Sequence, residues 1–117
     1  MHLRFKDKIK EADKLTMKKI YICSPLRGNT KQNIKDAKKY CRYVIKRGFM
    51  PIAPHIYFTQ FLADDIKKER NLGLKMGMEL MELCDELWVF GDQITDGMNK
   101  EINYCKKINK ACKKVKA

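Results

Sequence analysis

Short apolar runs alternate with helical patterns along this chain, and this alternation limits the folds that it can adopt. Residues 20–23, 49–53 and 86–90 have the length and β-rich character of buried strands, and each run stops at a proline or glycine. Between and after them, apolar residues recur at three- and four-residue steps over 29–47, 69–83 and 98–109. This order predicts an α/β domain whose sheet is parallel and has four to five strands, the last of them an edge strand at 111–115.

The chain length fits one domain. With 117 residues, 44% of them hydrophobic, the chain can bury a core without a disulfide or a metal. Residues 1–16 are expected to form a charged N-terminal extension and residues 17–117 the domain. No segment approaches the roughly 20 apolar residues of a membrane span, and the N-terminus lacks the apolar block of a signal peptide. We therefore expect a soluble, cytoplasmic protein with no membrane partner.

The charge of the chain is strongly positive but unevenly placed. The net charge is +12, yet residues 48–105 hold five basic and ten acidic residues, so the positive charge lies near the two ends and on one helix. Lysine-rich faces are usually solvated, and the basic residues are not interleaved with aromatic ones that stack on bases. Nucleic-acid binding is therefore the least favoured of the functions considered.

The five cysteines predict no chemistry. They lie at positions 23, 41, 84, 105 and 112, with no C-x-x-C pair and no histidine at zinc-ligand spacing. Cys41, Cys84 and Cys105 fall on apolar faces of expected elements. The cysteines are interpreted as reduced and mostly buried thiols, and we expect no metal site and no cofactor.

Three unusual segments directly follow the expected strands. They are Ser24 to Gly28, Pro54-His55, and residues 91–101. Ligands of parallel α/β sheets bind beyond the carboxyl ends of the strands, and a parallel sheet brings these ends to one edge. We therefore expect the three segments to form one site in which Arg27, His55 and Glu101 share a cleft.

The individual residues leave alternatives open. The turn from Ser24 to Thr30 offers backbone N–H groups, a helix N-terminus and the Arg27 guanidinium to an anion, but it equally fits an ordinary strand–helix turn. Glu101 is expected in the first turn of the last helix, where the helix dipole favours its ionised form, as a nucleophile, a general base or merely a capping group. The Tyr21 hydroxyl points either toward the site or into the core, and His55 is either a ligand contact or structural.

The expected helix over residues 69–83 is apolar on more than one side. Leu72, Met76, Leu80 and Leu83 form one stripe, and Leu74, Met78 and Met81 widen it. Such a helix is sandwiched or lies at an interface, so we expect a homodimer or a larger assembly.

Four sequence motifs occur in order along the chain: Y-I-C-S-P-L-R-G at 21–28, P-I-A-P-H at 51–55, C-D-E-L-W-V-F-G at 84–91, and Gly97-Met98 with Glu101. Together they resemble the nucleoside 2-deoxyribosyltransferase-like superfamily, in particular its small bacterial and phage-type members and the related deoxynucleoside-monophosphate N-glycosidases. The resemblance covers about residues 18–115. It implies a Rossmann-like or flavodoxin-like domain that pairs into dimers. The chain departs from those enzymes at Gly77, where they carry an acidic residue, and at Asn99-Lys100.

The resemblance implies cleavage of an N-glycosidic bond, or deoxyribosyl transfer, on a deoxynucleoside or its 5′-monophosphate. The phosphorylated form is favoured because of Arg27, and the alternative is a nucleotide-binding module without turnover that acts as a sensor or accessory protein. In relatives, the glutamate at the position of Glu101 attacks the anomeric carbon. The tyrosine at the position of Tyr21 orients the carboxylate of this glutamate. The expected substrate-binding residues are Ser24, Arg27, Gly28, His55, Asp92, Thr95, Gly97 and Met98.

Overall fold

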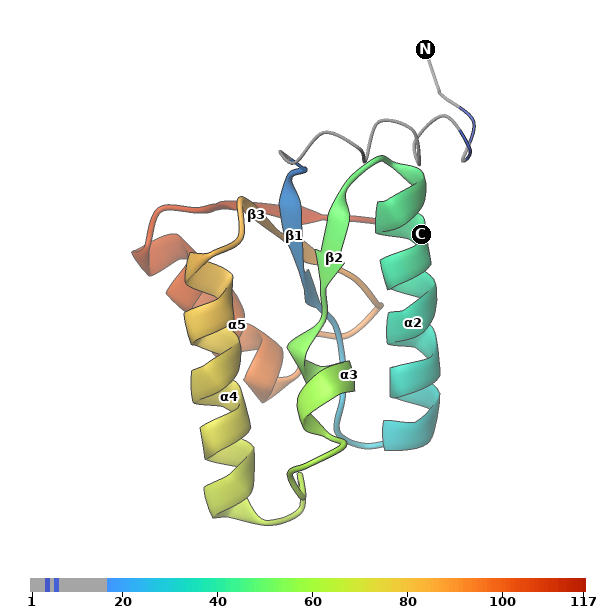
Figure 1. Ribbon diagram of the computed structural model, residues 1–117. Helices are drawn as coiled ribbons and strands as arrows, with labels where there is room; N and C mark the ends of the chain where they lie inside the picture. The colour runs from blue at the N-terminus through green and yellow to red at the C-terminus, as the bar shows by residue number, and fades with distance from the viewer. Residues whose placement is uncertain (1–3, 5, 7–16) are drawn as a thin grey trace.

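Four parallel strands form the centre of the molecule in the order β2-β1-β3-β4 (Figure 1). The computed structural model describes residues 4, 6 and 17–117, so the expected extension 1–16 lies outside the described residues except for positions 4 and 6. The strands are β1 (Lys19–Cys23), β2 (Met50–Ile52), β3 (Glu86–Val89) and β4 (Ala111–Lys114). This arrangement confirms the predicted single α/β domain with a parallel sheet.

Strand β1 is the central element because it pairs on both sides. Ile20 lies opposite Pro51 of β2 and Glu86 of β3. Pro51 cannot donate a ladder hydrogen bond on its free side, and this suits β2 as an edge strand of the described sheet. The chain first leaves β1 toward β2 and then crosses back to β3, so the strand order reverses between β1 and β3.

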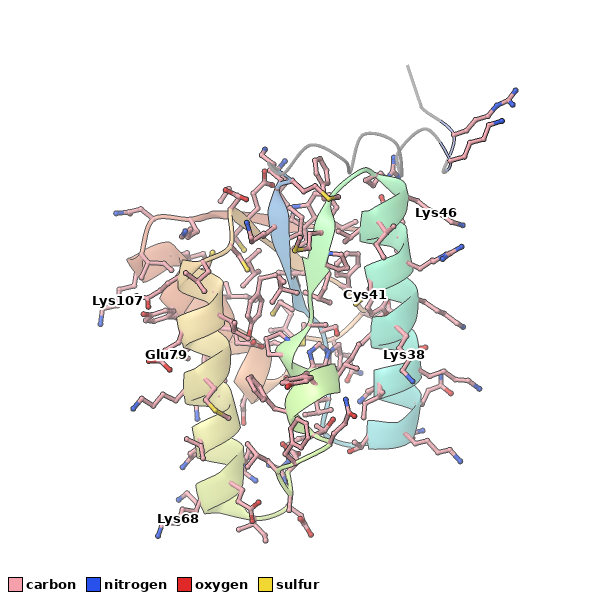
Figure 2. All side chains as sticks on the ribbon, in the orientation of Figure 1. Lys38, Cys41, Lys46, Lys68, Glu79 and Lys107 are labelled. Atoms are coloured by element: carbon pink, nitrogen blue, oxygen red, sulfur yellow. The ribbon has the colours of Figure 1, made fainter. Side chains whose placement is uncertain are left out.

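One face of the sheet is covered by α2 (Thr30–Lys46). The Asn29 side chain begins this helix by accepting a hydrogen bond from the Gln32 backbone N–H. Val44 is fully buried against a core that includes Ile20, Ile22, Trp88 and Phe90. Figure 2 shows Lys38 and Lys46 on the side of α2 that points away from the sheet, whereas Cys41 packs partly against this core. The basic residues of α2 therefore form a solvated face.

The other face is covered by α4 (Lys67–Glu82) and α5 (Asp96–Lys107), with the short α3 (Pro54–Phe58) packed against α4 (Figure 1). Its core contains residues from both sheet and helices: Tyr21, Cys23, Met81, Cys84, Leu87, Val89, Met98 and Cys105. The alternation of side chains along a strand places Tyr21 on this face and its neighbours Ile20 and Ile22 on the α2 face. The hydroxyl of Tyr21 thus lies on the same side of the sheet as α5.

The cysteines lie largely as expected. All five are free thiols, with Cys23, Cys84 and Cys105 buried, Cys41 half-buried and Cys112 exposed on β4. Within the described part of the chain, no helix is long and apolar enough to cross a membrane.

Substitution in the α2-facing core should cost far more stability than substitution outside it. Ile22→Ala removes a fully buried side chain between β1 and α2, and we expect it to lower the free energy of unfolding by about 2–5 kcal/mol. The matched control is Ile94→Ala, because Ile94 is 46% exposed; a loss below about 1 kcal/mol is expected there. Urea unfolding followed by circular dichroism measures both, and equal losses would contradict this core assignment.

Candidate functional site

A cavity of about 450 Å³ opens at the carboxyl ends of the strands. Segments that follow β1, β2 and β3 all line it, and it lies where the strand order reverses between β1 and β3. Ligands of open α/β sheets bind at such a reversal, and this volume suits a small organic molecule. Arg27, His55 and Glu101 therefore share one cavity, as the positions of the three segments predicted.

Glu101 projects from α5, and its carboxylate accepts hydrogen bonds from two residues of β1. The Tyr21 hydroxyl donates a hydrogen bond to Glu101 Oε2, and the Cys23 thiol donates to Oε1 over 3.8 Å. Tyr21 and Cys23 are two residues apart on one strand, so their side chains point to the same face. Of the two alternatives for Tyr21, the hydroxyl thus points toward the site. Both oxygens of the carboxylate thus accept hydrogen bonds from buried residues of β1.

The expected helix position of Glu101 is wrong, and so is the expected effect on its ionisation. The Thr95 side chain caps α5 by accepting from the Met98 backbone N–H, so the helix begins at Asp96 and Glu101 lies in its second turn. The dipole effect fades beyond the first turn. Burial raises the pKa of Glu101 from 4.5 to about 7, and the hydrogen bonds from Tyr21 and Cys23 oppose this rise.

Gly77 of α4 makes room for the Tyr21 hydroxyl. A Cβ atom at position 77 would lie 2.8 Å from the Tyr21 Oη and 3.7 Å from Pro54. Any side chain at this position would have to displace the hydroxyl that binds Glu101. The close packing of α4 on β1 thus depends on glycine at this point.

Ser24 and His55 join the ends of β1 and β2. Ser24 Oγ and His55 Nε2 are hydrogen-bonded at 2.9 Å, and both residues line the cavity. Burial lowers the pKa of His55 from 6.5 to about 4, so the ring is neutral at neutral pH. His55 therefore brings no positive charge to the cavity, and its Nε2 is paired with Ser24.

The turn that carries Arg27 is held by α2. Gly28 has a φ of +98°, a backbone conformation that favours glycine. The Asn33 amide donates to the carbonyls of Leu26 and Arg27, at 3.0 Å and 3.1 Å. The Arg27 Nε lies 3.3 Å from Asp64 Oδ2 in the segment between α3 and α4. Arg27 is thus positioned in the cavity but already has an anionic partner.

The remaining expected residues fall into two groups. Thr95, Gly97 and Met98 line the cavity at the start of α5. Asp92 does not belong to the cavity lining; it is exposed and acts electrostatically on Tyr40, whose ring stacks on Phe90 on the α2 face. The structure thus separates Asp92 from the other expected site residues.

Several lining residues were missed by the sequence analysis. The segment before α4 and its first turns contribute Leu62, Asp64, Glu69, Arg70 and Asn71, while the end of α3 contributes Phe58 and the residue after it, Thr59. The signal for them was weak because charged residues at the start of a helix usually face solvent. Among the described residues, no group of three or more His, Cys, Asp or Glu side chains could hold a metal ion.

Comparison with known proteins identifies a family and a fold. The sequence model of DUF7768, described as a domain of unknown function, matches residues 18–115, so the chain belongs to this family. Comparison with curated protein sequences gives no match. Among solved structures, the chain is similar to the 2-deoxyribosyltransferase of the psychrotolerant bacterium Bacillus psychrosaccharolyticus, with a TM-score of 0.59 and 19% identity over 82% of this chain and 70% of that chain. At this identity the likeness establishes the flavodoxin-like fold.

The raised pKa of Glu101 predicts a specific dependence of stability on pH. The native state keeps the Glu101 proton up to about pH 7, whereas the unfolded chain releases it near 4.5, so this carboxyl makes the fold less stable as pH rises through that window. Glu101→Gln removes the effect and should gain about 2 kcal/mol relative to wild type between pH 5 and pH 8. Urea unfolding of both proteins at the two pH values measures this.

Comparing wild type with Glu101→Gln separates the contribution of Glu101 to the pH dependence of stability from that of His55. The lowered pKa of His55 acts in the opposite direction, making the fold more stable as pH rises from about 4 to 6.5, but it is common to both proteins and cancels. A difference in unfolding free energy that stays constant from pH 5 to pH 8 would show that Glu101 titrates normally.

Proposed function

We propose that this protein cleaves the N-glycosidic bond of a deoxynucleoside or its 5′-monophosphate, or transfers the deoxyribosyl group, with Glu101 as the nucleophile. The observation that carries the proposal is the carboxylate of Glu101, held by Tyr21 inside a cavity at the reversal of the strand order. The fold likeness to a 2-deoxyribosyltransferase supports a nucleoside as the substrate class.

The chemistry requires two displacements at the anomeric carbon. In the first, an ionised Glu101 oxygen bonds to C1′ while the C1′–N bond breaks; the bonding electrons leave with the base, which takes up a proton from solvent. In the second, water or another base attacks C1′ and gives up a proton to solvent, the C1′–O bond to Glu101 breaks, and the carboxylate is regenerated. Tyr21 orients the nucleophile throughout, because burial and the nearby Glu101 charge raise the pKa of its hydroxyl and keep it a donor.

The other cavity residues are suited to binding the substrate rather than to breaking the N-glycosidic bond. Ser24, His55 and Thr95 offer hydrogen-bonding groups to hydroxyls or to a base, and Gly97 lets the backbone approach closely. Arg27 and Gly28 offer donors to an anionic group next to the start of α2. No cofactor enters this scheme.

The alternative function is a nucleotide-binding module without turnover. It is favoured by the raised pKa of Glu101, because a carboxyl that titrates near 7 is partly protonated at neutral pH and is then no nucleophile. Gly77 favours it too, since it leaves Glu101 without the second acidic side chain that the resemblance leads one to expect there. Binding of nucleotides without release of base would establish this alternative.

Substitutions at Glu101 and Tyr21 separate the enzyme from the binding module. Glu101→Gln keeps the shape and removes the nucleophile, so release of free base from deoxynucleosides should fall by at least 10³-fold while the protein still binds them. Tyr21→Phe removes one orienting hydrogen bond and should slow the reaction by about 10- to 100-fold. Chromatography of free base from a panel of deoxynucleosides and their 5′-monophosphates measures both, with Asp92→Asn outside the cavity as the control. Full activity of Glu101→Gln would refute the nucleophile.

We further propose that α4 forms a homodimer interface. The face of α4 that is buried contains Gly77 and Met81. The apolar stripe predicted from the sequence lies elsewhere on the helix, because its first and last members, Leu72 and the C-cap residue Leu83, are 47% and 70% exposed. An exposed apolar face of this kind is typical of an interface.

Light scattering tests the assembly. The mass should be at least twice the 13.8 kDa of one chain, and Leu72→Glu/Leu83→Glu should return it to that value. The control is Lys38→Glu/Lys46→Glu on the solvated face of α2, which should leave the mass of the assembly as it is. A wild-type mass of one chain at high protein concentration would contradict the dimer.

A further inference from the structure

Arg27 and Asp64 form an ion pair inside the cavity. The Arg27 Nε and Asp64 Oδ2 atoms are 3.3 Å apart, and the exposed fractions of their side chains are 59% and 22%. The pair joins the turn after β1 to the segment between α3 and α4, and both parts of the chain line the cavity. The Arg27 guanidinium is therefore neutralised by an internal carboxylate before any ligand arrives.

Both sides of the ion pair are held by hydrogen bonds between side chains and backbone groups. On the side of Asp64, the Arg70 guanidinium donates to the Asp64 carbonyl at 3.3 Å, and Glu69 Oε1 accepts from the Ala63 N–H at 3.1 Å. On the side of Arg27, Asn33 holds the carbonyls of the turn. Asp64 is thus fixed over Arg27 by the first turn of α4 and does not belong to a free-standing surface pair.

An incoming phosphate would meet the negative charge of Asp64 at the point where Arg27 would bind it. Asp64 already compensates the charge of the guanidinium at Nε, so a phosphate that binds the terminal nitrogens of Arg27 gains less attraction from it and is repelled by the nearby carboxylate. An uncharged sugar hydroxyl is not repelled in this way. It can donate a hydrogen bond to Asp64, since a carboxylate accepts hydrogen bonds from hydroxyl groups.

We propose that Asp64 determines substrate specificity at this cavity by opposing a 5′-phosphate, so that deoxynucleosides are preferred over their monophosphates. The inference rests on the proposed function for its substrate class and reverses the preference that Arg27 alone led us to expect. The effect is moderate, because a half-exposed ion pair is partly screened by solvent.

The experiment measures binding, by titration calorimetry, of 2′-deoxyadenosine, 2′-deoxyadenosine 5′-monophosphate and inorganic phosphate. Asp64→Asn should tighten the binding of the two phosphate ligands about fivefold, and Asp64→Ser serves as a second variant should the first fail to fold. The matched control is Asp65→Asn, which removes the same charge from the adjacent exposed position. The double variant Arg27→Ala/Asp64→Asn should lose the gain, since the gain depends on a freed guanidinium.

The outcomes separate this inference from the proposed function. Asp64→Asn and Asp64→Ser that bind phosphate no more tightly than wild type would overturn the role of Asp64, and so would an equal gain from Asp65→Asn or a gain that survives in the double variant. The inorganic phosphate measurements decide this whether or not base is released. If they show the expected gain while no variant cleaves or binds a deoxynucleoside, the anion selectivity stands and the proposed function fails.

Discussion

The parallel pairing of β1 with both β2 and β3 is the constraint on which the rest of the structure depends. Because β1 lies between two strands that are reached by crossovers on opposite sides, the turns that follow β1, β2 and β3 meet at one edge. Helix α2 covers one face of β1, while α4 and α5 cover the other, so Tyr21 and Cys23 are buried donors beneath that edge. A carboxylate reaching over from α5 then finds two fixed partners in an otherwise apolar environment.

This burial has opposite effects on the chemistry of Glu101. Burial disfavours the charge and raises its pKa to about 7, whereas the two hydrogen bonds favour the charge and keep the rise within the physiological range. The proposed nucleophile must be ionised, so the proposed reaction accelerates as pH rises through about 7. A bound sugar that develops positive charge at C1′ would stabilise the ionised form further, because an opposite charge nearby favours it.

The strands and the convergence of the site could be predicted from the sequence because both depend on local patterns. Apolar runs closed by Pro25, Pro54 and Gly91 mark the strand ends, and parallel topology brings their turns together without any knowledge of side chains. The start of α5 was predicted two residues late, because the Thr95 cap is visible only once the loop geometry is known. Asp64 and Arg70 were missed for a related reason: their partners are set by the path of the segment between α3 and α4, which has no periodic pattern. Gly77 was noted only as a departure from the resemblance, and its contact with Tyr21 comes from the packing of two distant elements.

A covalent bond between Glu101 and deoxyribose is the central requirement of the proposed reaction. The most direct measurement is intact-mass spectrometry of the protein, acid-quenched during incubation with deoxynucleosides, followed by peptide mapping. We expect a mass increase equal to one deoxyribosyl group, located on Glu101 and absent from Glu101→Gln. Free base released with no adduct on wild type, or with the adduct on another residue, would contradict it.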